Sequence, residues 1–281
     1  MSKNFKVGID YGGTKIEGIL MDNEGNEILR KRSTYEKNYK SGIQTVSSLV
    51  EEFDKHTGTI NTVGVGIPGS SSKETGLIKN ANSIWLNDKP FKQDLENSLG
   101  RDIRLMNDAN CFALSESIDG SGRGYDSVWG VIIGSGFGGS FVYKNQVIEG
   151  VNQVAGDWGH QPLPYPNEEE QELGLKCEVG NCHRPLCAEQ FISGVGFTKL
   201  FNLKYGTNFR TREIVALEAN GDERAKKEFD LYEDRFARLI AIMIGIVDPD
   251  VIILGGGMSN IGRIYKNIPK ILPKYTFSDK V

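Results

Sequence analysis

The segment KVGIDYGGTKIEGIL, Lys6 to Leu20, places apolar residues at every second position on both sides of a glycine turn. Val7 and Ile9 precede the turn, and Ile16 follows it with the same spacing. Alternation of this kind is typical of a strand that buries one face, and a short glycine-containing connection lets the chain reverse direction. The segment therefore predicts two antiparallel strands joined by the turn.

The opening pattern occurs a second time in SVWGVIIGSGFGGSFVYKNQVIEG, Ser127 to Gly150. The other predicted elements are a third strand from Glu27, a helix from about Ile43 to His56, strands in TVGVGIPGS and DIRLMNDAN, a helix from about Ala109 to Ser117, a helical region from Thr211 to about Val247 and a strand in VIILGGGMSN. The second half of the last helical region is apolar all round, so we expect it to be buried. Alternating strands and helices predict an α/β protein, and the repeated unit predicts two similar domains.

Length and composition restrict the classes of protein to which the chain can belong. Its 281 residues fit one large domain or two ordinary ones. The formal net charge of −4 argues against a general nucleic-acid-binding protein, which needs a basic surface. The N-terminus lacks the apolar core of a signal peptide, and no apolar run reaches the roughly 18 residues of a membrane span. We therefore expect a cytoplasmic protein that binds neither nucleic acid nor membranes.

Three glycine clusters each follow an apolar strand. They are Gly12-Gly13-Thr14, Gly134-Ser135-Gly136-Phe137-Gly138-Gly139 and Gly255-Gly256-Gly257. Glycine exposes backbone N–H groups that bind phosphate, although each cluster alone is also compatible with a tight structural turn. None matches the Walker A pattern or a dinucleotide fingerprint. Three such clusters in a chain of two matching halves favour a nucleotide, whose negative charge needs a bridging cation in an acidic protein.

The sequence Asn107-Asp108-Ala109-Asn110 lies where a predicted strand meets a predicted helix. Asn and Asp are preferred at helix N-termini, so capping is one interpretation. The other interpretation is a catalytic carboxylate. The residues alone leave both roles open.

The stretch from Val154 to Phe191 contains two of the three histidines and three of the four cysteines. In a reducing compartment, clustered cysteines are more often metal ligands or redox groups than disulfides. The candidate ligands of a tetrahedral zinc ion are His160, Cys177, Cys182 and Cys187, with His183 as a rival. The C-x4-C-x4-C spacing differs from the common C-x2-C knuckle, so reduced thiols are the alternative interpretation.

Together these motifs resemble those of the ROK family of bacterial sugar kinases, within the actin/hexokinase-like superfamily. The resemblance spans Val7 to Asn260 and rests, in the order of the family, on GIDYGGTKIEG, GVGIPG, KNANSIWLN, RLMNDANCFALSE, GSGFGGS, GDWGHQPLP, CAEQFISGVGF and DPDVIILGGGMSN. It implies the two-domain actin/hexokinase-like (ribonuclease H-like) α/β fold, with a cleft between the domains. The expected domains are residues 1–117, with the first phosphate loop and the catalytic aspartate, and residues 118–281, with the zinc site and the adenosine-binding glycine loops.

The resemblance also implies a role for each candidate residue. Asp108 is the expected catalytic base, which accepts the proton of a sugar hydroxyl during phosphoryl transfer. The expected sugar-binding residues are Gly69, Asn82, Asn107, Asp157, His160 and Glu189. The expected ATP-binding residues, with Mg²⁺ near the first of them, are Asp10, Gly12, Gly13, Thr14, Lys15, Gly134, Ser135, Gly136, Gly138, Gly139, Gly255, Gly256 and Gly257. The family motif Glu-x-Gly-His begins with Asp157 here, and this shorter carboxylate changes the reach toward the sugar.

The family carries a structural zinc site that uses the histidine of this motif and three cysteines. The resemblance therefore implies structural Zn²⁺ on His160, Cys177, Cys182 and Cys187, which would hold His160 and Glu189 beside the sugar. Cys187 and Cys182 lie where the family has cysteines, whereas Cys177 lies further upstream and needs a longer loop to reach the metal.

Within the family, KNANSIWLN and the tryptophan of GDWGH resemble the manno(fructo)kinase type of fructokinase. We therefore expect ATP-dependent phosphorylation of D-fructose to fructose 6-phosphate, with mannose or glucose as further substrates. The alternative is an N-acetylglucosamine or N-acetylmannosamine kinase, because NDANCFALSE is shared with those branches. A sugar-responsive ROK regulator is less favoured, because no helix-turn-helix segment precedes the loop that begins at Asp10. A homodimer is expected, and the closing C-terminal helix of the family is expected to be absent.

Overall fold

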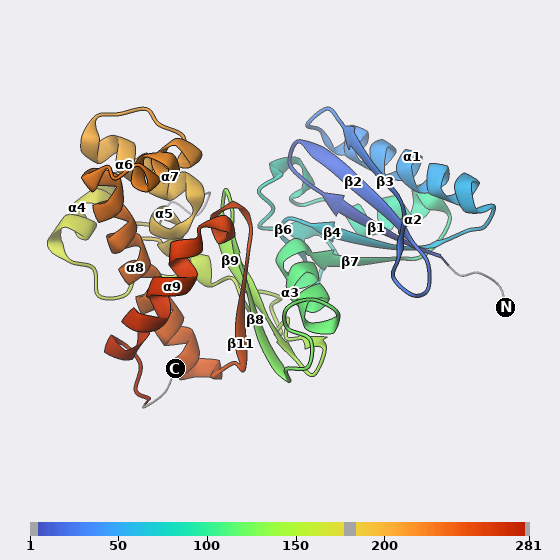
Figure 1. The fold of residues 1–281 in the computed structure, drawn as a ribbon. Coiled ribbons are helices and arrows are strands. Elements are labelled where there is room, and N and C mark those ends of the chain that lie inside the picture. The colour runs from blue at the N-terminus through green and yellow to red at the C-terminus, as the bar shows by residue number, and fades with distance from the viewer. Residues whose placement is uncertain (1–4, 177–183, 279–281) are drawn as a thin grey trace. The chain divides into compact units, whose positions relative to one another are not determined.

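The computed structural model describes residues 5–176 and 184–278, and it divides into two compact units (Figure 1). Unit 1 comprises the chain up to Cys111 together with Gly150–Val154. Unit 2 comprises Phe112–Glu149 and the chain from Ala155 onward. The chain therefore passes from one unit to the other within helix α3 and returns briefly to unit 1 in the Gly150–Val154 segment.

Unit 1 is built on a five-stranded sheet with the strand order β3-β2-β1-β4-β7. Its elements are β1 (Lys6–Tyr11), β2 (Lys15–Met21), β3 (Glu27–Thr34), α1 (Tyr39–Thr57), β4 (Thr62–Ile67), β5 (Ser70–Ser71), β6 (Ile78–Lys79), the 3₁₀ helix η1 (Ile84–Leu86), α2 (Phe91–Leu99), β7 (Ile103–Asn107) and the start of α3 (Asp108–Ile118). Strands β1, β2 and β3 are antiparallel, as the alternating pattern predicted, whereas β4 and β7 join in parallel.

Helix α1 packs against the unit 1 sheet because its apolar residues recur at helical spacing. Val46, Val50 and Phe53 are fully buried in the same core as Val7 and Ile9 of β1. The predicted helix from Ile43 to His56 is thus confirmed, and it begins earlier because the side chain of Asn38 accepts the backbone N–H of Ser41.

Unit 2 is built on a four-stranded sheet with the strand order β10-β9-β8-β11. Its elements after α3 are β8 (Ser127–Ile133), β9 (Phe137–Tyr143), β10 (Gln146–Val147), η2 (Trp158–His160), α4 (Glu168–Lys176), α5 (Ala188–Ile192), α6 (Gly194–Tyr205), α7 (Thr211–Ala219), α8 (Glu223–Val247), β11 (Val251–Gly255), η3 (Gly257–Asn260), α9 (Gly262–Ile271) and η4 (Leu272–Lys274). Strands β8 and β9 are antiparallel and β11 joins β8 in parallel, which repeats the order of the first four strands of unit 1.

The helical region predicted from Thr211 to Val247 is interrupted. It forms α7 and α8, and Asp222 begins the second helix by accepting the backbone N–H groups of Arg224 and Ala225. The expectation that the end of α8 is buried all round was wrong, because Ile242 is 42% exposed and Ile246 is 69% exposed. No helix among the described residues combines the length and apolar character needed to cross a membrane.

Candidate functional site

The polar residues of unit 1 gather at one edge of its sheet, where the parallel strands β1, β4 and β7 end. Asp10 lies opposite Gly66, and Ile67 lies opposite Asn107. Because the carboxyl ends of parallel strands meet at the same edge, side chains that follow them share a neighbourhood. Three segments far apart in the sequence therefore contribute to one site.

The first glycine cluster forms a tight turn between β1 and β2. The N–H of Gly12 donates to the carbonyl oxygen of Lys15 at 3.1 Å and closes the turn. Among the described residues, the N–H groups of Gly13 and Thr14 meet no acceptor, and both residues are exposed. Two outward backbone donors in a glycine turn are a binding arrangement for an anionic oxygen.

Gly69, which follows β4 in the chain, is hydrogen-bonded to the end of β7. The side-chain amide of Asn107 donates to the carbonyl oxygen of Gly69 at 3.0 Å. Gly69 has a φ of +81°, and a Cβ atom there would lie 2.5 Å from the carbonyl oxygen of Lys79. Only glycine fits this backbone, which brings the chain before Asn82 close to Asn107.

The segment that carries Asn82 is held by a residue that the sequence did not identify. Asn87 accepts the N–H of Ala81 at 2.9 Å and donates to its carbonyl oxygen at 3.1 Å. The side-chain amide therefore replaces a backbone partner on both sides of Ala81. This pair of hydrogen bonds fixes the backbone immediately before Asn82, whose predicted role is to bind sugar.

Asp108 is the first residue of α3 and is exposed. The capping role is shared, because Asn107 accepts the N–H of Asn110 at 3.2 Å while Asp108 accepts that of Ala109 at 2.8 Å. Asn107 thus makes the capping bond from the residue before the helix, as the capping interpretation of this motif predicted. As a carboxylate, Asp108 can accept a hydrogen bond from a hydroxyl group.

The carboxylates of Asp10 and Asp108 both lie within electrostatic range of the thiol of Cys111. Burial raises the pKa of Cys111 to about 11, and the charges of Asp108 and Asp10 add to this effect. Asp10 as a residue is exposed, but its carboxyl group is partly shielded from water by surrounding protein atoms, and this burial raises its pKa. The negative charge of Glu17 raises the pKa further, whereas the positive charge of Arg32 lowers it. Carboxylate oxygens are the ligands that Mg²⁺ prefers, so Asp10 and Asp108 are candidates for contact with a nucleotide-bound cation.

In unit 2, two glycine turns meet where the parallel strands β8 and β11 end. The N–H of Gly134 donates to the carbonyl oxygen of Gly136 at 2.9 Å, and the carbonyl oxygen of Gly134 accepts the N–H of Gly194 at 2.8 Å. A Cβ atom on Gly256 would lie 3.1 Å from the nitrogen of Gly134. The second and third glycine clusters and the start of α6 therefore form one continuous backbone surface, with Ser135 exposed.

The second glycine turn is shorter than the sequence predicted. Gly138 and Gly139 belong to β9, opposite Ile132 and Val131 of β8. Gly139 is buried, and its N–H donates to the carbonyl oxygen of Gly156 at 3.1 Å. Both glycines are therefore part of the sheet, and the turn itself consists of residues 134–136.

Glu189 supports this turn from α5. It is 7% exposed, and its Oε2 accepts the N–H of Phe137 at 3.0 Å. Asp157 precedes η2 and is exposed, whereas Trp158 is buried against Phe137 with ring centroids 4.8 Å apart. The structure thus brings Glu189 to the second glycine turn and leaves Asp157 at the surface of unit 2.

Two of the four predicted zinc ligands lie together. The Sγ atom of Cys187 is 3.7 Å from Nδ1 of His160, and it also donates to the carbonyl oxygen of Gly159 at 3.2 Å. Cys177 and Cys182, like the rival His183, lie outside the described residues. Within residues 5–176 and 184–278 there is no group of three or more side chains that could hold a metal ion.

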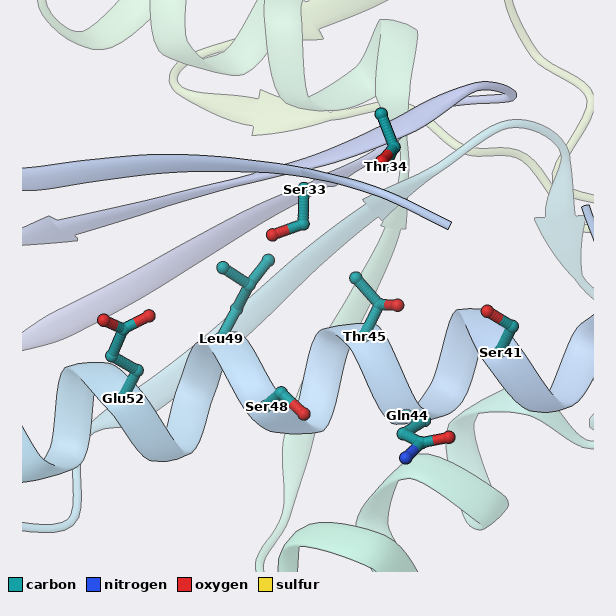
Figure 2. Close-up of a pocket in the computed structure, with 8 residues that line it drawn as sticks. All are labelled: Ser33, Thr34, Ser41, Gln44, Thr45, Ser48, Leu49 and Glu52. Carbon is teal, nitrogen blue, oxygen red and sulfur yellow. The ribbon is translucent and has the colours of Figure 1, made fainter. Parts of the chain in front are cut away.

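A separate open pocket of about 400 Å³ lies between β3 and α1 (Figure 2). It is lined by Ser33, Thr34, Ser41, Gln44, Thr45, Ser48, Leu49 and Glu52. None of the predicted site residues lines it, and five of its eight lining residues carry a hydroxyl group. It is therefore distinct from the sites described above.

Comparison with known proteins identifies the family. The sequence profile of the ROK family matches residues 6–280. The N-acetyl-D-glucosamine kinase of Vibrio cholerae is 36% identical over 277 residues, and the match covers 96% of this chain and 90% of that protein. The fold resembles the crystal structure of the ROK hexokinase from Thermus thermophilus, with a TM-score of 0.82, 24% identity, and coverage of 96% of this chain and 88% of that one. The predicted actin/hexokinase-like α/β fold is thus confirmed.

A regulator shares the same fold. The crystal structure of a ROK family transcriptional regulator, a homologue of the E. coli MLC protein, has a TM-score of 0.82 at 17% identity and covers 98% of this chain and 71% of its own. The fold alone therefore does not distinguish kinases from regulators, and the activity has to be argued from sequence similarity and from the residues of the site.

Proposed function

The chain is a sugar kinase of the ROK family, and we propose that it transfers the γ-phosphoryl group of ATP to the 6-hydroxyl of N-acetyl-D-glucosamine. The observation that carries the proposal is the 36% identity, over 277 residues, with an N-acetyl-D-glucosamine kinase. This choice replaces D-fructose, which the sequence motifs had favoured, by the alternative that they had left open.

The residues that favoured fructose have structural roles. Trp158 is 6% exposed and packs against Phe137 and Trp129 inside unit 2. In KNANSIWLN, Trp85 donates to the hydroxyl of Tyr11 at 3.2 Å, and Asn87 holds Ala81. Because these side chains bind protein atoms, their identity carries little information about the sugar.

Asp108 is the proposed catalytic base. Its carboxylate accepts the proton of the attacking hydroxyl, so that the oxygen bonds to the γ-phosphorus as the bond to the β-γ bridging oxygen breaks and ADP leaves. Asn107 and Gly69 are joined by a hydrogen bond beside it and supply the rigid surroundings of the sugar. Much of the rate enhancement comes from this positioning, because phosphoryl transfer requires an aligned nucleophile more than a strong base.

The phosphates of ATP are the proposed ligands of the two glycine turns. Gly13 and Thr14 present outward N–H groups in unit 1, and residues 134–136 form the corresponding turn in unit 2. Gly256 and Gly257 are exposed beside the second turn and are proposed to contact adenosine. Asp10 would hold Mg²⁺, largely through water, and the bound ion supplies positive charge that neutralises the phosphates.

The geometry of His160 and Cys187 fits the proposed structural zinc ion. Zinc binds histidine nitrogen at about 2.0 Å and thiolate at about 2.3 Å, which in a tetrahedral site places the two ligand atoms about 3.5 Å apart. The observed separation of Nδ1 and Sγ is 3.7 Å. With Cys177 and Cys182 as the remaining ligands, the zinc ion would have no open position, and its role is to orient the His160 ring.

The test is ADP release by the purified chain with a panel of N-acetylglucosamine, N-acetylmannosamine, fructose, mannose and glucose. N-acetylglucosamine is expected to give the highest kcat/KM. The Asp108→Asn variant, purified in parallel, measures the background from contaminating kinases. A higher kcat/KM for fructose, or for any sugar without an N-acetyl group, would show that the proposed substrate is wrong.

A further inference from the structure

An aromatic cluster lies directly beneath the first glycine turn. The hydroxyl of Tyr35, just after β3, donates to the carbonyl oxygen of Gly12 at 2.9 Å. The ring of Tyr35 packs edge-on against Tyr11, with centroids 5.4 Å apart, and against Trp85, with centroids 6.1 Å apart. Tyr35 is the member of this cluster whose hydroxyl bonds to the backbone of the turn.

The rest of the cluster is closely packed. Tyr11 is 1% exposed, and its hydroxyl accepts the indole N–H of Trp85. A Cβ atom on Gly42 of α1 would lie 1.9 Å from that hydroxyl, so the helix leaves room for Tyr11 only because this residue is glycine. A tyrosine ring packed against such neighbours has little freedom to move its own hydroxyl.

The bond to Gly12 determines the direction of the next backbone donor. The carbonyl of Gly12 and the N–H of Gly13 belong to one planar trans peptide, so they point in opposite directions. Glycines on both sides of this peptide give it unusual rotational freedom. When Tyr35 holds the carbonyl oxygen on the inner side, the N–H of Gly13 points outward, where it meets no acceptor among the described residues.

We propose that Tyr35 is a positioning residue that orients the Gly13 N–H toward the triphosphate of the nucleotide. The inference rests on the proposed function, because it assumes that this turn binds phosphate. Without the hydroxyl, the Gly12–Gly13 peptide would become ordered only when the nucleotide binds. The free-energy cost of that ordering would weaken nucleotide binding.

The cluster also connects the turn to the sugar-binding segment. Trp85 lies three residues after Asn82, and Ser83 Oγ would lie 3.6 Å from a Cβ atom on Gly13. The two segments therefore share one support. Because the hydroxyl of Tyr35 donates to the backbone of the turn itself, its loss is expected to affect the nucleotide more than the sugar.

The experiment compares Tyr35→Phe with Tyr39→Phe. Tyr39 is a matched control because its ring packs on Phe91, which also packs on Tyr11, while its hydroxyl donates to Asp94 at 2.7 Å instead of to the glycine turn. Removal of the Tyr35 hydroxyl is expected to raise KM for Mg-ATP about 2- to 10-fold, the equivalent of one net hydrogen bond. KM for the sugar and the melting temperature should change no more than in Tyr39→Phe.

A calorimetric titration with Mg²⁺ and a non-hydrolysable ATP analogue, without sugar, separates this inference from the proposed function. The dissociation constant should rise by the same factor as KM in Tyr35→Phe alone. Equal constants for Tyr35→Phe, Tyr39→Phe and the wild type would overturn the inference, and so would a rise confined to KM for the sugar. A wild type that binds the analogue but phosphorylates no sugar would overturn only the proposed function, and one that binds no nucleotide would overturn both.

Discussion

Replacement of Glu170 by glutamine is expected to destabilise unit 2 strongly, although Glu170 is not in the candidate site. This residue of α4 is 1% exposed, and its carboxylate accepts Arg235 Nε at 2.8 Å and Arg238 Nη2 at 2.6 Å. Both arginines belong to α8 and are themselves buried. Two guanidinium groups thus share one carboxylate away from water, and a neutral amide would remove the negative charge that compensates most of their positive charge.

The magnitude follows from the burial and from the remaining partners. Loss of one partner from a buried ion pair costs about 3–5 kcal/mol. Arg238 retains Asp234 at 3.2 Å, a carboxylate that is 31% exposed, so we expect the lower part of this range, about 3 kcal/mol. At roughly 2–4 °C per kcal/mol for a unit of this size, the melting temperature should fall by about 6–12 °C.

The assay is urea unfolding followed by circular dichroism, with Glu169→Gln as the matched control. Glu169 is the preceding residue of α4 and pairs with Lys204, but its side chain is 47% exposed. An exposed pair of this kind contributes less than about 1 kcal/mol. If Glu170→Gln and Glu169→Gln have the same unfolding free energy at pH 7, the reasoning is refuted.

The pH dependence provides a second check. Burial opposes the charged form of Glu170, but hydrogen bonds from Arg238 and Arg235 outweigh it and hold the pKa below its usual value. A carboxylate with a lowered folded pKa stabilises the protein above its unfolded pKa of about 4.3, and this contribution is lost as the pH falls through the folded value. The difference between wild type and Glu170→Gln should therefore be complete at pH 7 and shrink below about pH 4.

Three further predictions concern the candidate site. Asp108→Asn should lower kcat about 10²- to 10⁴-fold while the melting temperature stays within about 2 °C, and wild-type turnover in the folded variant would remove Asp108 from the role of base. Gly69→Ala should raise KM for the sugar at least about tenfold, because its φ of +81° and the nearby carbonyl oxygen of Lys79 force the backbone to shift. Steady-state kinetics with both substrates measure this effect, and an unchanged KM for the sugar would contradict the prediction. Elemental analysis of fresh protein should find about one zinc ion per chain, which Cys187→Ser lowers together with the melting temperature, and metal-free protein of full activity would contradict the zinc site.

Elements whose pattern is local could be predicted from the sequence. The alternation around Ile9 and Ile16 identified β1 and β2 because a strand with one buried face imposes a period of two residues. The interruption before α8 also had a local signal that was not used. Asn220-Gly221 is a turn sequence, and Asp222 after it is a suitable N-cap.

Features that depend on tertiary contacts could not be predicted in this way. Gly139 belongs to a glycine-rich run like those of phosphate-binding turns, but it is buried in β9 because Gly156 approaches its backbone. The hydroxyl of Tyr35 bonds to a turn 23 residues earlier, and no local pattern indicates that contact. Ile246 is apolar yet 69% exposed. Its exposure could not be predicted, because the composition of a helix does not reveal which of its sides is covered by other elements.

The repeated strand order explains why both units carry a candidate ligand-binding turn. In each, the first strand of a hairpin also pairs in parallel with a later strand, β4 in unit 1 and β11 in unit 2. The hairpin turn therefore lies at the same edge as the loop after that parallel strand. Gly69 follows β4 with a φ of +81°, and Gly256 follows β11 with a φ of +83°. In unit 1 this loop bonds to Asn107 beside Asp108, whereas in unit 2 it packs on Gly134. The same arrangement of strands thus places the carboxylate of Asp108, the proposed base, at this edge in unit 1, whereas in unit 2 the Glu189 carboxylate at the corresponding turn accepts the N–H of Phe137.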